Sequence, residues 1–153
     1  MKHFYISVAL AALATLPCFG QQSTTPVTTI VGKDHPELID DGTAYWHLFR
    51  SLSRSDKDTD DMFQRRRLAF ANKTGLTPTQ VTKLLAAADK FTEQMAAFKG
   101  LPETPPNHDA RTNAVLSIVS ALQQSIGPYA SSMLTNYVNT KVKTTITIFQ
   151  PKP

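Results

Sequence analysis

The spacing of apolar residues predicts helices over most of the chain after residue 40. Apolar residues that recur at steps of three and four share one face of a helix. The first such stripe consists of Tyr45, Leu48, Phe49 and Leu52. The longest lies within residues 77–99 and consists of Val81, Leu84, Ala88, Phe91, Met95 and Phe98. Because this seam lasts less than three heptads and has uncharged flanks, it predicts a helix of a bundle rather than a free-standing coiled coil.

Three further segments have helical character. Residues 58–75 run from acidic to basic, as the helix dipole favours, and their apolar face would consist of Met62, Phe63, Ala69 and Phe70. The segment from about Asp109 has the stripe Val115, Ile118, Val119, Leu122 and Ile126. After Gly127-Pro128, a broad apolar face would consist of Tyr129, Ala130, Met133, Leu134, Tyr137, Val138 and Val142. We therefore predict an all-α bundle of four to five amphipathic helices.

Proline, glycine and threonine mark the boundaries of this helical domain, which we place at residues 40–143. The sequence GLPETPPNH, residues 100–108, predicts an internal break. Residues 21–39 are expected to be a flexible leader, and residues 144–153 a tail. Both flanks contain β-prone runs, VTTIV at 27–31 and TTITIF at 144–149. These runs could pair as a ribbon or add an edge to a partner, but flexible flanks are the favoured interpretation.

The first 20 residues have the pattern of a cleaved signal peptide. Lys2 precedes an apolar run, residues 6–16, that is shorter than the roughly 20 residues of a membrane span. Small residues then lead to a predicted cleavage site after Gly20, so we expect export to the periplasm or the extracellular space. The alternatives are a short membrane anchor and a lipidated Cys18. No later segment is long and apolar enough to cross a membrane.

The formal net charge of +4 gives only weak support for anionic partners. Residues 65–67 are three consecutive arginines, and consecutive helical residues point about 100° apart. The triplet therefore wraps around its helix, and we predict no nucleic-acid binding. Pairing with Asp58, Asp60 and Asp61 is the favoured interpretation. The alternative is a basic lip beside a binding groove, extended by Arg50 and Arg54.

The sequence contains no recognisable motif for catalysis or metal binding. The chain has no G-x-S-x-G elbow, no phosphate-binding glycine loop and no H-E-x-x-H. His35, His47 and His108 are far apart, and the acidic run 56–61 lacks the glycine and glutamate of a calcium loop. We predict no metal, no cofactor and no enzymatic activity. An enzyme assembled from residues distant in the sequence stays as an alternative.

The sequence GLTPTQV, residues 75–81, has the features of a helix start. Thr77 and Gln80 have the spacing of a capping box, and Pro78 suits the first helical position. Leu76, Thr77 and Gln80 also match the LTxxQ motif, so the chain resembles the Spy/CpxP-type periplasmic chaperones. This resemblance implies a helical homodimer that holds unfolded clients on a concave basic surface. A capping box alone also accounts for these residues.

A second resemblance extends over more of the chain. An aromatic segment at 45–49, the arginine-rich helix, GLTPTQ and a late Gly127-Pro128 helix are similar to a group of small exported bacterial proteins. That group has no function to carry over, so the resemblance implies export and a helical fold only.

Trp46 lies beside the apolar stripe of its helix, which leaves it partly available to a partner. The candidate protein-binding surface consists of Trp46, Phe49, Arg50, Arg54, Arg65, Arg66 and Met95. We expect an exported helical protein that binds other proteins, as a chaperone-like or stress-related factor with protein clients. The alternative is a passive cell-envelope protein with one dedicated partner.

Overall fold

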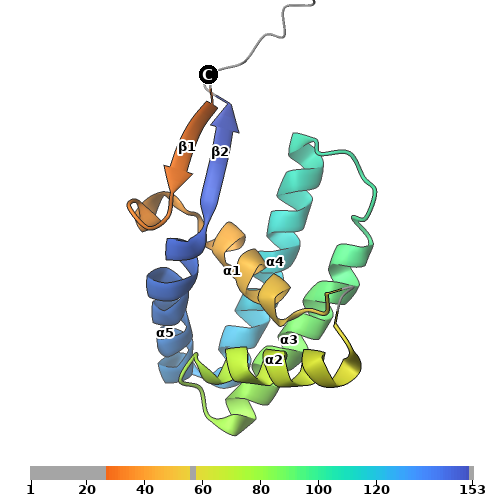
Figure 1. Ribbon diagram of the computed structural model, residues 1–153, viewed down its shortest axis with the longest axis vertical. Coiled ribbons are helices and arrows are strands. Elements are labelled where there is room, and N and C mark those ends of the chain that lie inside the picture. The colour runs from red at the N-terminus through yellow and green to blue at the C-terminus, as the bar shows by residue number, and fades with distance from the viewer. Residues whose placement is uncertain (1–26, 56–57, 152–153) are drawn as a thin grey trace, which may run out of the picture.

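The computed structural model describes residues 27–55 and 58–151. The predicted signal peptide, its cleavage site after Gly20, the start of the leader and part of the acidic run 56–61 lie outside these residues. Within them the chain folds into a bundle of five α-helices with one short two-stranded antiparallel ribbon, which confirms the predicted all-α class (Figure 1). No helix in the described ranges has both the length and the apolar character of a membrane span.

The elements follow one another with short connections. The chain begins with β1 (Val27–Val31) and a 3-10 turn (Pro36–Leu38). The helices are α1 (Asp41–Leu52), α2 (Asp60–Asn72), α3 (Pro78–Ala96), α4 (Pro105–Ile126) and α5 (Pro128–Tyr137). A π-helical turn (Val138–Val142) and a 3-10 turn (Lys143–Thr145) then lead into β2 (Thr147–Pro151).

Local capping residues determine where the helices begin. The Asp40 side chain accepts a hydrogen bond from the Thr43 amide, 2.8 Å away, at the start of α1. Helices α3, α4 and α5 each have a proline in the first turn, where a missing amide proton leaves no bond unmade. For this reason α4 begins at Pro105, and the break predicted over residues 100–108 is shorter than expected.

The predicted stripes of α1 and α4 form the centre of the core. All of their residues are buried: Tyr45, Leu48, Phe49, Leu52, Val115, Ile118, Val119, Leu122 and Ile126. Helix α3 adds Val81, Leu84, Ala88 and Phe91. The rings of Phe49 and Phe91 lie 5.6 Å apart and join α1 to α3. The hydrophobic pattern therefore predicted these three faces correctly.

The predicted apolar face of α2 is right for Phe63 and Phe70, which are half-buried, and wrong for Met62 and Ala69. Met62 is 53% exposed and Ala69 is exposed, whereas Arg67 and Ala71 are the buried residues. The Arg67 guanidinium donates to the Leu85 carbonyl and lies 2.7 Å from the Asp89 carboxylate. Buried charge is tolerated here because Arg67 has both a carbonyl and a carboxylate partner on α3.

The apolar face of α5 is also narrower than predicted. Ala130, Leu134, Val138 and Val142 are buried, but Tyr129 is 79% exposed. Tyr129 lies in the first turn of α5, one residue before the buried Ala130, so the helical rotation directs it away from the core.

The β-prone flanks pair with each other instead of being flexible over residues 27–39 and 144–151. Strands β1 and β2 are antiparallel, with Ile30 opposite Ile148, and the ribbon projects from the helices in Figure 1. Its base is held tightly, because the Gly32 amide donates to the Ile146 carbonyl at 2.8 Å. A Cβ atom on Gly32 would lie 1.9 Å from the Lys143 carbonyl oxygen, so only glycine fits. The helices between the two flanks bring these distant segments together.

Candidate functional site

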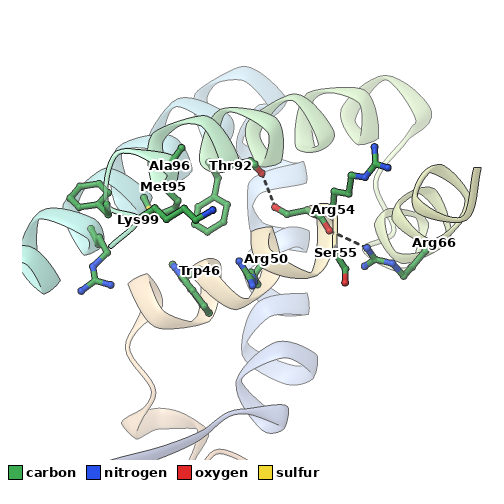
Figure 2. A pocket seen from close by; sticks show the side chains of 13 residues that line it. Trp46, Arg50, Arg54, Ser55, Arg66, Thr92, Met95, Ala96 and Lys99 are labelled. Carbon is green, nitrogen blue, oxygen red and sulfur yellow. Dashed lines mark hydrogen bonds between the residues drawn. The ribbon is translucent and has the colours of Figure 1, made fainter. Parts of the chain in front are cut away.

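Five of the seven residues predicted to form a binding surface line one cavity of about 710 Å³: Trp46, Arg50, Arg54, Arg66 and Met95 (Figure 2). We call this cavity the basic groove. Its other lining residues are Ser53, Ser55, Phe91, Thr92, Ala96, Phe98, Lys99 and Arg111. Helices α1, α2, α3 and α4 all contribute to it, so residues distant in the sequence form one concave surface.

The floor of the basic groove is apolar and continuous with the core. Trp46 is half-buried and packs edge-on against Phe91, with ring centroids 6.2 Å apart and planes at 81°. Phe91 also contacts Phe49 in the core. Met95 and Phe98 continue the α3 seam beyond the core and are half-buried in the groove. The predicted seam therefore has two roles, packing at one end and lining the groove at the other.

The rim of the basic groove is positively charged. Among the described residues that line it, none is acidic, and five are cationic: Arg50, Arg54, Arg66, Lys99 and Arg111. Three of them have carboxylate partners outside the lining: Arg54 pairs with Asp60, Arg66 with Asp58 and Arg111 with Glu103. The side chains of Arg50 and Lys99 have no hydrogen bond or ion pair to any residue in the described ranges. These two cations are available to an anionic ligand.

Arg66 belongs to the wall of the groove and has a structural role. Its guanidinium donates to the Ser51 and Ser53 carbonyls, at 2.8 and 3.0 Å, and to Asp58 at 2.6 Å. These contacts satisfy carbonyls at the carboxyl end of α1 and attach that end to α2. A hydrogen bond from the Ser55 backbone, and then Arg66, lower the pKa of Asp58 below its usual value. Arg66 is thus less available to a ligand than Arg50.

Two predicted surface residues are not part of the groove. Phe49 is 0% exposed and lies in the core, where its ring is 6.2 Å from that of Tyr45, so it cannot contact a partner. Arg65 lies outside the groove lining and is mostly exposed, 2.5 Å from Asp61 on the same helix. Residues 65–67 point to three different partners, which confirms that the triplet forms no single patch. Helical rotation separates each excluded residue from a neighbour that lines the groove.

The LTxxQ residues lie at the opposite end of α3 and line no part of the groove. The Thr77 amide donates to the Gln80 side-chain oxygen at 3.0 Å, in the predicted capping box. The Gln80 side-chain amide also lies 3.4 Å from the Ile126 carbonyl, at the end of α4. Leu76 and Val81 are buried beside the cap. In this structure the motif closes one end of the α3–α4 pair.

Sequence reasoning missed Lys99, Phe98 and Arg111 as site residues. Lys99 follows the end of α3, whereas Arg111 lies in the second turn of α4, and no periodicity connects them. The turn between these antiparallel helices brings them to one cavity. The only available signal was the α3 seam, which continues to Phe98 in the sequence.

A smaller cavity of about 200 Å³ adjoins the basic groove, and we call it the side cavity. It shares Trp46 and Arg111 with the groove, so the two cavities are adjacent. Its other lining residues are Gly42, Thr43, Glu103, His108, Thr112 and Val115. A hydrogen bond from Arg111 is the main cause of the lowered pKa of Glu103, so the Glu103 carboxylate is ionised at neutral pH.

Metal-ligating side chains are dispersed. Over residues 27–55 and 58–151, no three His, Cys, Asp or Glu side chains lie close enough together to hold a metal ion. Comparison with known proteins identifies no relative: no protein-family model, no curated protein and no solved structure matches this chain significantly.

Proposed function

We propose that this chain is an exported protein that binds other proteins, and that the basic groove holds polypeptide segments rich in apolar and acidic residues. The observation that supports this best is the pair of unpartnered cations, Arg50 and Lys99, beside an apolar floor formed by Trp46, Phe91 and Met95. A segment with both residue types would bury apolar area against the floor and place carboxylates near the cations.

The side chains of the basic groove can adapt to different segments, which favours a chaperone-like role over a single dedicated partner. Met95 is unbranched and polarizable, and such side chains adapt to ligands of different shape. Arg50 and Lys99 are long and exposed, so they can follow a carboxylate over several positions. A dedicated partner in the cell envelope is the second candidate. Export is expected for both, whereas a homodimer is expected for the chaperone-like role.

An aggregation assay with two unrelated unfolded clients separates these candidates. A chaperone-like protein slows the aggregation of both clients, whereas a dedicated binder slows neither. Because Trp46 is the only tryptophan and lines the groove, its fluorescence reports occupancy when the clients lack tryptophan. Clients that bind without any change in Trp46 emission would place binding elsewhere and contradict the proposal.

Charge removal tests the role of Arg50 against a matched control. Arg50→Ala should weaken the binding of an acidic segment about fivefold to tenfold, as expected for loss of a favourable charge contact. Arg65→Ala removes the same charge from an exposed helical position outside the groove and should leave affinity within about twofold. Titrations at low and high salt should show the larger salt dependence for unmodified protein. If both variants lose the same affinity, the loss comes from the lower net charge of the protein and not from a contact with Arg50.

A further inference from the structure

The side cavity differs from the basic groove in the chemistry of its lining. Its walls come from α1 and α4, and Val115 is 1% exposed at its base. Gly42, Thr43 and Thr112 contribute small or methyl-bearing groups, and Trp46, His108, Glu103 and Arg111 complete the lining. Glu103 and Arg111 lie 2.5 Å apart, so their charges largely cancel. A neutral side chain therefore suits this cavity better than an anionic one.

The side cavity has room for one bulky apolar side chain. At about 200 Å³ it exceeds an apolar cavity of about 150 Å³, which is enough to hold benzene. Gly42 maintains its tight base, because a Cβ atom there would lie 2.8 Å from the Thr112 methyl group. Glycine in the first turn of a helix lowers helix stability, so its presence fits a packing requirement between α1 and α4.

We propose that the side cavity is an anchor pocket for one Phe or Leu side chain of the bound polypeptide, whose acidic residue lies next to Arg50 and Lys99. This inference rests on the proposed function of the basic groove. Trp46 lines both cavities, so it separates the two contact points and lies under the segment that joins them. The preferred ligand is thus a polypeptide with a bulky apolar residue and an acidic residue a short distance apart, and both residues contribute to its affinity.

Acetylated, amidated peptides with one Phe, one Asp and a neutral spacer of two to five residues test this assignment. Binding is measured by Trp46 fluorescence and by isothermal titration calorimetry. At the best spacing, replacing the peptide Phe by Ala should weaken binding about tenfold or more, as expected for loss of one buried aromatic side chain. Replacing Asp by Asn should weaken it about fivefold.

A cavity-filling variant tests whether the peptide Phe binds in the side cavity. Thr112→Leu adds volume inside the side cavity. It should weaken the binding of the Phe peptide about tenfold and change the affinity for the Ala peptide less than twofold. Asn113→Leu adds an apolar side chain at the adjacent exposed position and should change neither. Circular dichroism and urea titration confirm that both variants fold. If Thr112→Leu weakens both peptides equally, the anchor pocket is wrong. If unmodified protein binds no peptide or unfolded client, the proposed function fails with it.

Discussion

The two ends of the α3–α4 pair are built differently. At one end Gln80 and Lys83 of α3 donate to the Ile126 and Ser125 carbonyls at the end of α4. At the other end, Lys99 and Arg111 border a cavity instead of joining the helices. We call these the closed end and the open end. Side chains at the closed end bond terminal carbonyls, whereas those at the open end leave charge and apolar surface available for binding.

One amphipathic seam runs through both ends of α3. Val81 near the closed end is 3% exposed, whereas Met95 near the open end is half-buried in the groove. The spacing of the two residues on the seam is equivalent, so the difference comes from what covers them. The seam is covered by neighbouring helices where they pack closely, and the cavity begins where this cover ends.

The largest expected effect is a loss of stability that distinguishes a core residue of α1 from a groove residue of the same helix. Phe49→Ala should lower the free energy of unfolding by about 3–5 kcal/mol, because it opens a cavity in the packed core. Trp46→Ala should cost clearly less stability, since half-buried Trp46 already borders open space, but it should abolish peptide binding. Urea unfolding and calorimetry measure the two quantities. Comparable stability losses would show that Trp46 is a core residue.

An intermediate loss of stability is expected when the contacts of Gln80 at the closed end are removed. Gln80→Ala removes the capping-box contact with the Thr77 amide and the contact with Ile126, and should cost about 1 kcal/mol of stability. Peptide affinity should stay unchanged, because Gln80 lies at the far end of α3 from the groove. Thermal unfolding and peptide titration provide the two readouts. A loss of client binding with intact stability would instead favour a functional role for the LTxxQ residues.

The smallest effect concerns the groove wall and depends on pH. The pKa of Asp58 is lowered from 3.8, so its carboxylate stabilises the fold above that pH, and this stabilisation disappears as the pH falls through the folded-state pKa. Asp58→Asn should lower the melting temperature modestly at pH 7, and the difference from unmodified protein should shrink below about pH 4. Melting curves from pH 7 to pH 3 test this. If the difference in melting temperature is the same at every pH, the loss of stability does not come from the charge of Asp58.

Much of the candidate site followed from the sequence, but its limits did not. Trp46, Arg50, Arg54, Arg66 and Met95 were predicted and lie around one groove. Phe49 and Arg65 were predicted with them and lie elsewhere, because the cluster was chosen by residue type without a covering surface. The sequence shows on which face of its helix each residue lies. The packing of neighbouring helices decides whether that face borders the core, the groove or solvent.

The sequence by itself determined the presence of the helices, the capping box of α3 and the three main core stripes, because these depend on spacing and on contacts a few residues apart. Only the tertiary structure decided the rest. The ribbon joins residues 27–31 to 147–151, and the groove joins Lys99 to Arg111 and Trp46. Such contacts depend on how whole helices pack, and no local pattern records that packing.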